Sequence, residues 1–345
     1  MKKTKKIAIA LSGGIDSLVA AYILKKQGAD LFGIHFKTGY ENRKTDLAKT
    51  GDRLGIQIIT IDLGSAFELH VIDYFIKTYL KGKTPNPCIL CNKKIKFDAL
   101  YKACRDLGAD FIATGHYAGI EKDESGQNCL VKAKDNTKDQ SYFLAMLDQE
   151  QLGRTIFPLS DMCKSEVKEF AALNGLIPPE KKESQDICFI KNNSFSEFIL
   201  LKKAMKPVPG PIVTTDGKNI GTHDGLHKFT IGQRRGLNCP GPAPYYVKRI
   251  DIEHNTLVVG FKDELFKTEL FLEDIHWTGR PVNCCHEMIT KIRYSHKGAD
   301  SVFVPDTSRT DRAKIIFHQA QYAITPGQAA VFYSSNRVLG CGIIQ

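Results

Sequence analysis

Residues Ile7–Lys26 read IAIALSGGIDSLVAAYILKK and join an apolar run, a glycine pair and an amphipathic segment without a break. The run IAIAL is continuously apolar, as in a strand buried on both faces of a parallel sheet. The segment Asp16–Gln27 has the apolar spacing of a helix, and the glycine pair marks a tight turn before it. This stretch therefore predicts the first strand, loop and helix of a parallel sheet.

The same alternation of short apolar runs and helical patterns continues to residue 115. Further strands are predicted at Leu31–Phe36, Ile56–Leu63 and Phe111–Gly115, and further helices at Arg43–Leu54, Phe67–Leu80 and Phe97–Gly108. Strands that alternate with helices predict an α/β fold with a doubly wound parallel sheet. Ligands of such sheets bind at the carboxyl ends of the strands.

The pattern changes near residue 195. Ser194 and Glu197 have the spacing of a capping box and predict a short helix that ends near Lys203. Glycine, proline and asparagine then interrupt any long helix. From about Glu269 the chain contains several short apolar runs separated by turns, which predict a small antiparallel β-barrel.

Composition limits the class of protein. The chain has 345 residues, 42% of them hydrophobic, a formal net charge of +10 and ten cysteines. No apolar run reaches the ~18 residues that span a bilayer, and the basic N-terminus lacks the apolar core of a signal peptide. We therefore expect a cytoplasmic protein of two or three domains that makes no membrane contact and whose cysteines are mostly free. The positive charge is compatible with nucleic-acid binding but does not establish it.

The segment Ser12–Ser17, SGGIDS, lies between the first strand and the first helix. Glycines let the backbone approach a phosphate, and the amide groups that open a helix favour an anion. Asp16 can hold Mg²⁺. The Walker and GxGxxG patterns are absent, and SGGxDS in this position resembles the loop of the ATP pyrophosphatases, or PP-loop enzymes. The alternative is a plain glycine-rich connection. The loop predicts ATP binding and adenylation, but amidating, ligating and thiolating enzymes share it.

The cysteines help to choose among these reactions. Cys88 and Cys91 lie in the proline-rich segment TPNPCILCN, and Lys93, Lys94 and Lys96 follow, which predicts lowered thiol pKa values. Cys188 lies far along the chain in ESQDICFI. Four other cysteines lie in apolar or helical runs and are expected to be buried and structural: Cys104, Cys129, Cys163 and Cys341.

Seven motifs besides SGGIDS together resemble the bacterial tRNA-specific 2-thiouridylase family: TPNPCILCNKKIKF, ATGHYAGI, KDQSYFL, ESQDICFI, GTHDGLHKFTIGQRRGL, IRYSHKGAD and TPGQAAVFY. The resemblance implies a PP-loop catalytic domain over residues 1–195, a small central domain that contacts tRNA over 196–265, and a C-terminal β-barrel over 266–345. It also implies ATP-dependent conversion of the wobble uridine, U34, of Lys, Glu and Gln tRNAs to 2-thiouridine.

The resemblance carries over to individual positions. It implies ATP contacts at Ala10, Leu11, Ser12, Gly13, Gly14, Ile15, Asp16, Ser17, Phe36 and Gly115. It implies tRNA contacts at Asn86, Pro87, Cys88, His116, Lys138, Asp139, Gln140, Arg293, Tyr294 and Gln328. Cys91 falls on the position of the nucleophile, and Cys188 on the position that carries the persulfide. For Gly221–Leu237 a structural hairpin and a phosphate-binding segment both remain open.

One position departs from the family pattern. The best-known members have Asp where this chain has Cys88, so the loop here reads Cys-x-x-Cys. Cys88, Cys91 and Cys188 can then be three ligands of a [4Fe–4S] cluster whose open iron takes up sulfide. The other reading keeps Cys91 and Cys188 as a persulfide pair, with Cys88 near the base. The expected sulfur donor is a cysteine desulfurase or a sulfur-relay protein for the persulfide pair, or free sulfide for the cluster.

Two alternative functions are an amidating synthetase and a non-catalytic RNA-binding module. An amidating synthetase of the PP-loop class would have no use for Cys91 or Cys188, and no glutaminase domain is evident. A non-catalytic RNA-binding module would have no use for a complete SGGIDS loop.

Overall fold

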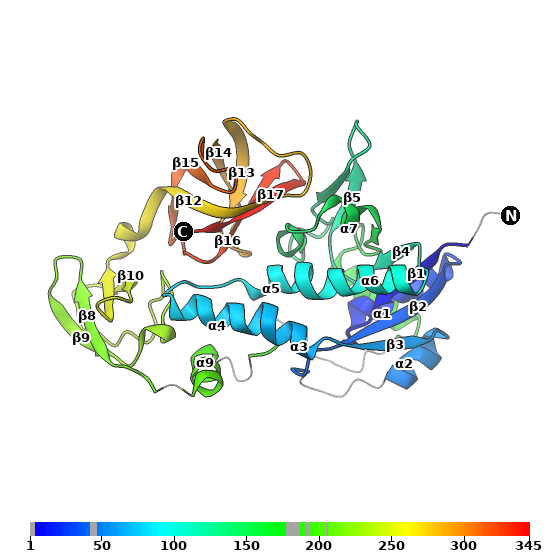
Figure 1. Cartoon of the computed structure of the whole chain (residues 1–345), viewed down its shortest axis with the longest axis horizontal. Helices are drawn as coiled ribbons and strands as arrows, with labels where there is room; N and C mark the ends of the chain where they lie inside the picture. The colour runs from blue at the N-terminus through cyan, green and yellow to red at the C-terminus, as the bar shows by residue number, and fades with distance from the viewer. Residues whose placement is uncertain (1–3, 42–46, 177–186, 191–193, 205) are drawn as a thin grey trace.

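The structure is a computed structural model that describes residues 4–41, 47–176, 187–190, 194–204 and 206–345. Part of the predicted helix Arg43–Leu54 and most of the ESQDIC motif lie outside the described residues. In Figure 1 a parallel sheet lies at the right, the C-terminal barrel at the upper left and a smaller group of strands at the lower left.

The parallel sheet has the order β3-β2-β1-β4-β7. Its strands are β1 (Lys6–Ala10), β2 (Asp30–Lys37), β3 (Ile58–Asp62), β4 (Phe111–Ala113) and β7 (Thr155–Ile156). Successive side chains of β1 point to opposite faces: Ile7 and Ile9 join one core, and Ala8 joins another. Helices α1 (Ile15–Lys26) and α8 (Lys164–Leu173) cover the first face, and α6 (Asp98–Asp106) covers the second. The doubly wound α/β fold is confirmed, although β7 was not predicted.

Two long helical stretches extend from this sheet toward the smaller group of strands (Figure 1). The first consists of α3 (Gly64–Phe67), a π-helical segment (Glu68–Ile72) and α4 (Asp73–Leu80). The second consists of α5 (Pro87–Leu90), a π-helical segment (Cys91–Phe97) and α6. Pro87 is the first helical residue of α5, where its fixed φ suits the helix and its missing N–H costs nothing. Both predicted cysteines of the proline-rich segment therefore lie at the start of a helix.

A central four-stranded sheet follows α9 (Phe195–Lys203), whose start is capped by the Ser194 side chain as predicted. The sheet contains β8 (Gly210–Thr214), β9 (Asn219–His223), β10 (Tyr246–Asp251) and β11 (Thr256–Gly260). These strands were not predicted, because the many glycines and prolines between them obscure the alternation. Leu226, Phe229 and Leu237 are buried in its core, which supports a structural role for Gly221–Leu237. Arg234 and Arg235 nevertheless stay exposed.

The C-terminal strands form the predicted barrel. They are β12 (Phe266–Trp277), β13 (His286–Lys291), β14 (Ala299–Pro305), β15 (Ala313–Tyr322), β16 (Ala329–Ser334) and β17 (Arg337–Ile344), and pairing of β12 with β17 closes the ring. A hairpin of the preceding part of the chain, β5 (Gly119–Lys122) and β6 (Asn128–Val131), joins this sheet where Val131 pairs with Arg337. The domain boundaries after residues 195 and 265 stay predictions.

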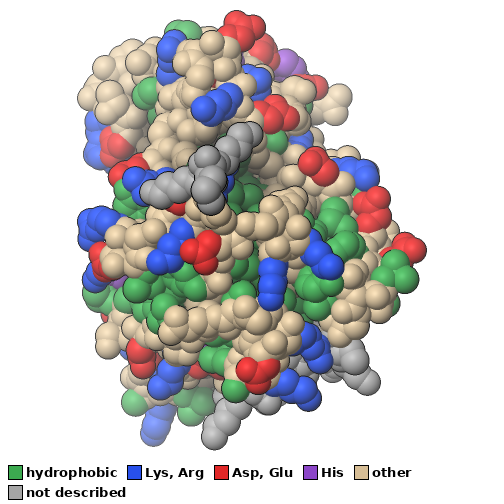
Figure 2. Space-filling view, turned by 90° about the vertical axis from the view of Figure 1, so that its right-hand side faces the viewer, with side chains coloured by type: hydrophobic (Ala, Val, Ile, Leu, Met, Phe, Trp, Pro, Cys, Tyr) green, Lys and Arg blue, Asp and Glu red, His purple; other side chains and the backbone are tan. Residues whose placement is uncertain are grey.

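The surface carries both signs of charge. On the face shown in Figure 2, Lys and Arg side chains are interspersed with Asp and Glu rather than gathered in one patch. Among the described residues, no helix has both the length and the apolar character needed to cross a bilayer.

The barrel core offers a direct stability test. Phe332 is fully buried, and its ring packs against Trp277 and Phe303 at centroid distances of 5.7 and 5.7 Å. We expect Phe332→Ala to lower the free energy of unfolding by about 3–5 kcal/mol because it leaves a cavity. Trp277 is the single tryptophan of the chain, so its fluorescence during urea unfolding reports on the barrel.

The matched control is Phe271→Ala. Phe271 is 55% exposed on the outer surface of the barrel. Its replacement by Ala should therefore lower the free energy of unfolding by less than about 1 kcal/mol. Equal losses for the two variants would contradict the described packing.

Candidate functional site

The glycine-rich loop is closed by its own side chains. The buried Ser17 hydroxyl donates to the Gly14 carbonyl at 2.9 Å and lies 3.3 Å from the Ser12 hydroxyl. Gly13 has a φ of +84°, a conformation that side chains rarely adopt. The loop therefore turns sharply and presents the first amide groups of α1 at the carboxyl edge of the sheet, where a phosphate can bind.

Gly115 meets this loop from the end of β4. A Cβ at Gly115 would lie 2.8 Å from both the Asp16 carbonyl carbon and the Ser17 nitrogen, so any side chain would collide with backbone. Phe36, at the end of β2, and Ala10, at the end of β1, pack against a shared core under the same edge. The structure thus gathers the predicted ATP-contact residues around one edge of the sheet.

The Asp16 carboxylate has two partners that the sequence did not reveal. The Lys164 ammonium lies 2.6 and 2.7 Å from the two carboxylate oxygens, and the Tyr117 hydroxyl donates to one of them at 2.7 Å. Lys164 is the first residue of α8 and lies 148 positions along the chain from Asp16, so no local spacing predicts the pair. One carboxylate together with substrate phosphates is a donor set that Mg²⁺ takes, so Asp16 fits a Mg²⁺ ligand.

The proline-rich segment is fixed to the barrel. The Gln328 amide donates to the carbonyls of Thr84 and Pro85, both at 3.0 Å. Asn86 is buried and donates to the Tyr142 hydroxyl at 3.4 Å, and that hydroxyl donates to the Ala329 carbonyl. Gln328, predicted to contact tRNA, therefore holds the segment that carries Cys88 and Cys91.

The three predicted cysteines share one neighbourhood but differ in exposure. Cys91 is buried, Cys88 half-buried and Cys188 exposed. Cys88 interacts electrostatically with both other thiols, and the Lys96 ammonium acts on all three.

The predicted lowering of the thiol pKa values is wrong. Burial raises the pKa of Cys88 to about 12 and also raises the pKa of Cys91, and the opposing effect of Lys96 is smaller. Lys93 does not help, because its ammonium is bound to Asp148 and Gln151 instead. The three lysines are near in sequence, but only Lys96 acts on the thiols.

All ten cysteines are free. Cys104 and Cys341 are buried, as predicted for structural residues, whereas Cys129 and Cys163 are only half-buried and correct that prediction. Within the described ranges, no three His, Cys, Asp or Glu side chains are arranged to hold a metal ion. The arrangement of Cys88, Cys91 and Cys188 therefore does not fit a metal centre.

Several predicted tRNA-contact residues support the local fold. Asp139 is buried, and its carboxylate accepts from the amides of Ala133 and Ser141 and from the Ser141 hydroxyl. The Gln140 side chain accepts from the Tyr117 amide at 2.9 Å. Lys138 belongs to the same loop, and its amide donates to the Asp135 carbonyl. These contacts shape the loop beside the glycine-rich turn.

Phe143 and Tyr294 form a pair of aromatic rings, the aromatic step, where this loop meets the barrel. The rings of Phe143 and Tyr294 are 4.4 Å apart, and Tyr294 is 37% exposed. The Lys291 ammonium lies 5.7 Å from the Tyr294 ring, and Arg293 donates to the Tyr322 carbonyl. Phe143 was missed by sequence reasoning, because its contact with Tyr294 joins distant parts of the chain. Lys291 was also missed, although it lies close to Tyr294 in the sequence.

His116 follows Gly115 in the sequence and interacts with Lys96 and Phe97 of the segment that carries Cys91. Its Nδ1 lies 2.8 Å from the Thr114 hydroxyl, and its ring is 6.0 Å from the Phe97 ring. Burial, with a contribution from Lys96, lowers the pKa of His116 to about 3, so the ring is neutral at physiological pH. His116 therefore follows the glycine that touches the loop and interacts with the lysine that also acts on the cysteines.

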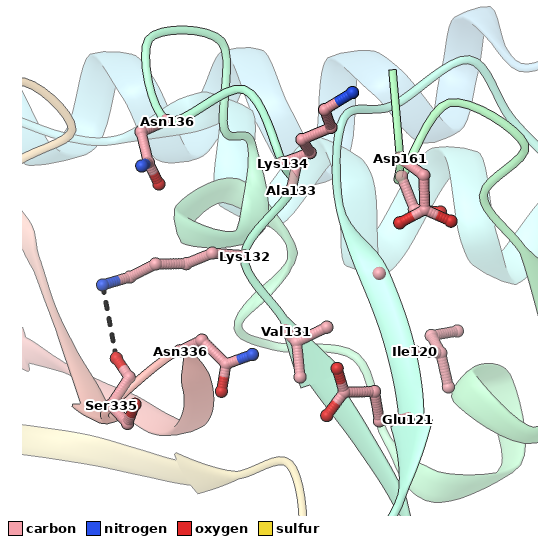
Figure 3. A pocket seen from close by; sticks show the side chains of 12 residues that line it. Ile120, Glu121, Val131, Lys132, Ala133, Lys134, Asn136, Asp161, Ser335 and Asn336 are labelled. Atoms are coloured by element: carbon pink, nitrogen blue, oxygen red, sulfur yellow. Dashed lines mark hydrogen bonds between the residues drawn. The ribbon is translucent and has the colours of Figure 1, made fainter. Parts of the chain in front are cut away.

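A separate polar cleft of about 710 Å³ opens between the β5–β6 hairpin and the β16–β17 turn (Figure 3). Lys132 points across it and donates to the Ser335 carbonyl at 3.4 Å. None of the predicted site residues lines it. Its size alone does not make it the active site.

Three family models match almost the whole chain. One described as the tRNA methyl transferase HUP domain matches residues 5–192, one described as the tRNA methyl transferase PRC-barrel domain matches 198–261, and one described as the aminomethyltransferase beta-barrel domain matches 267–344.

Curated relatives are similar over nearly their full length. A protein of Desulfosudis oleivorans named tRNA-specific 2-thiouridylase MnmA is 46% identical over 98% of this chain and 94% of its own. Proteins with the same name from Geotalea uraniireducens and Clostridioides difficile are 41% and 40% identical, over 99% and 100% of this chain and 96% and 99% of their own. The family-model descriptions mention methyl transfer, whereas the relatives are named for thiolation.

The thiol pKa values give a test of the site. Because burial raises the pKa of Cys91, we expect its alkylation by iodoacetamide to keep rising about tenfold per pH unit from pH 7 to 9. Lys96→Gln removes the charge that favours the thiolate and should slow alkylation by about threefold or more at each pH. Peptide mass spectrometry measures the modified fraction.

Lys94→Gln is the matched control, because Lys94 is exposed and does not act on these thiols. A rate that levels off below pH 8, or equal slowing by the two lysine variants, would contradict the described environment.

Proposed function

The chain belongs to the family of tRNA-specific 2-thiouridylases, and from that premise we propose that it converts the wobble uridine, U34, of Lys, Glu and Gln tRNAs to 2-thiouridine with ATP. One observation carries the proposal: Gly115 touches the glycine-rich loop, and the next residue, His116, shares Lys96 with all three cysteines. This contact and this shared lysine support a proposed phosphate site and a proposed sulfur site that both involve Gly115 and His116.

The proposed phosphate site at the glycine-rich loop suits chemical activation of the uracil base. The C2 carbonyl of uracil is a poor electrophile, so its O2 must first become a leaving group. In the proposed step O2 attacks the α-phosphorus of ATP, the bond from that phosphorus to the bridging oxygen breaks, and pyrophosphate leaves with the electron pair. The α1 amides and Ser12 are positioned to bind phosphate oxygens. Mg²⁺, when held by Asp16, supplies neutralising charge to these phosphates.

The two reacting cysteines differ in exposure, which suits two different roles in sulfur transfer. Cys188 is exposed, where a sulfur donor can reach it, and Cys91 is buried. The terminal sulfur of a Cys188 persulfide attacks C2, and O2 leaves with AMP. The Cys91 thiolate then attacks Sγ of Cys188, the persulfide bond breaks, and its electron pair stays on the sulfur bound to C2. A thiol reductant must return the resulting disulfide to two thiols.

The raised thiol pKa values fit this order of events. A free thiol that stays protonated is protected from premature oxidation, and Lys96 lies where it can stabilise a thiolate as it forms. His116 is neutral and half-buried, and it interacts with the same lysine, so it adds no competing charge. Lys96 thus assists Cys91 without keeping it permanently ionised.

The surface around the aromatic step suits an unstacked anticodon loop. The half-exposed Tyr294 ring can stack on a base, and Lys291 and Arg293 lie beside it to meet phosphates. A flipped uridine would then reach the segment Asn86–Cys88, which Gln328 and Tyr142 hold in place. A tRNA substrate also agrees with the expected cytoplasmic location.

The donor of sulfur is proposed by class. A cysteine desulfurase or a sulfur-relay protein can load the exposed Cys188, and free sulfide would instead be required by an iron–sulfur cluster. An amidating synthetase would leave the cysteine neighbourhood unused, and a non-catalytic RNA-binding module would leave the ATP loop unused.

Nucleoside analysis tests the proposal directly. The protein is incubated with ATP, Mg²⁺, a sulfur donor and unmodified Lys, Glu or Gln tRNA, and the digested tRNA is examined by mass spectrometry. We expect 2-thiouridine at position 34 only when every component is present. A tRNA whose wobble base is cytidine is the control. Absence of 2-thiouridine with a donor shown to be active would contradict the proposal.

Cysteine variants separate the two routes of sulfur delivery. We expect Cys91→Ala and Cys188→Ala each to lower thiolation by about 100-fold or more, because each removes a reacting atom. Cys88→Ala should retain activity within about threefold, since the persulfide route makes no bond to it. Cys284→Ala, at an exposed position in the barrel, is the control. Equal loss in all three site variants, with iron in anaerobic preparations, would favour the cluster instead.

A further inference from the structure

Cys188 lies in a tight turn whose two central side chains have opposite environments. The Ile190 amide donates to the Ile187 carbonyl at 3.0 Å, so Cys188 and Phe189 are the central residues of a β-turn. Cys188 is exposed, whereas Phe189 is only 2% exposed. The turn therefore presents the thiol to solvent and buries the side chain that follows it.

The Phe189 ring lies in an aromatic cluster. Its centroid is 5.1 Å from the ring of Phe75, 5.4 Å from Phe198, 5.8 Å from Phe67 and 6.1 Å from Tyr40. These are the distances of interacting aromatic pairs, and the pairs with Phe75 and Phe67 are edge-to-face. The partners come from the loop after β2, from the α3–α4 stretch and from α9. Phe189 is thus held by three separate parts of the chain.

The same cluster contains Cys91. Cys91 and Phe189 belong to one continuous apolar core, and the turn residues Ile187 and Ile190 pack against that core. The thiols of Cys91 and Cys188 interact electrostatically. The side chain of one reacting cysteine and the neighbour of the other therefore belong to the same packed unit.

We propose that Phe189 is a positioning residue whose buried ring holds Cys188 against Cys91 for sulfur transfer. This inference rests on the roles proposed for the two cysteines and deepens them. The Cys188 thiol must be open to a sulfur donor, yet it must also meet a buried thiol of the same chain. An anchor at the next residue satisfies both needs, because it fixes the backbone of Cys188 without covering its thiol.

Positioning matters here because a disulfide has a narrow geometry. Its two Cα atoms usually lie about 4.4–6.8 Å apart. A group on a short flexible connection meets its partner at an effective concentration of only about millimolar. An anchored backbone has already lost the freedom that such a search would cost. An apolar anchor also adds no charge that would alter the reactivity of either thiol.

The test measures the effective concentration of Cys188 toward Cys91 in glutathione buffers, without ATP, tRNA or a sulfur donor. Glutathione disulfide oxidises the two thiols, one disulfide forms between them, and two molecules of reduced glutathione are released. Fragment-ion mass spectrometry gives the bridged fraction and identifies the two bridged cysteines. We expect Phe189→Ala to lower the effective concentration about 10- to 100-fold. Phe189→Leu keeps much of the apolar volume and should stay within about threefold of the unaltered protein.

Phe195→Ala is the matched control. Phe195 packs against the same cluster, but its ring stacks on Tyr79 at 4.8 Å. Its loss should leave the effective concentration within about threefold of that of the unaltered protein. Circular dichroism checks that each variant folds. If Phe189→Ala does not fold, Phe189→Val replaces it, with an expected fall of about tenfold.

Three results would overturn the inference. The first is an unchanged effective concentration when Phe189 is shortened, and the second is an equal fall in Phe195→Ala, because the cluster as a whole would then be responsible. The third is a bridge from Cys188 to Cys88 in place of Cys91. Absence of 2-thiouridine in the nucleoside assay, with the bridges as expected, would contradict the proposed function and leave the positioning role supported.

Discussion

The close approach of Gly115 to the backbone of Asp16 and Ser17 is the contact on which the site depends. A single added carbon at residue 115 would lie 2.8 Å from that backbone, so β4 and the glycine-rich loop can meet only through glycine. This contact fixes where His116 and Tyr117 begin, and Tyr117 then reaches Asp16. Gly115 thus touches the glycine-rich loop, and the next residue, His116, interacts with the lysine that also acts on the cysteines.

The barrel contributes to the same site from the opposite side. Gln328 binds the backbone of Thr84 and Pro85, and Tyr142 connects Asn86 to Ala329. The cysteine segment is therefore held by a domain more than two hundred residues away in sequence. Gln328, which we propose as a tRNA contact, therefore also has a structural role in holding this segment.

Sequence reasoning succeeded where the information is local. The β1–α1 unit, the cap of α9 and the closed barrel were predicted from short patterns, because strand, turn and helix preferences act over a few residues. It failed where partners are distant. The sign of the thiol pKa shift was wrong because Asp148 takes Lys93 away and burial outweighs Lys96. Lys164 could not be found, since only the folded chain brings it to Asp16.

In the proposed reaction, ATP is spent on the oxygen that sulfur replaces. The measurement that tests it most directly uses an anticodon stem-loop whose target uridine carries ¹⁸O at O2. Mass spectrometry of the AMP formed during thiolation follows that atom. We expect one ¹⁸O in AMP for each 2-thiouridine made, because O2 leaves bound to the α-phosphorus. Unlabelled AMP alongside 2-thiouridine would contradict it, since ATP would then have been cleaved without activating the base.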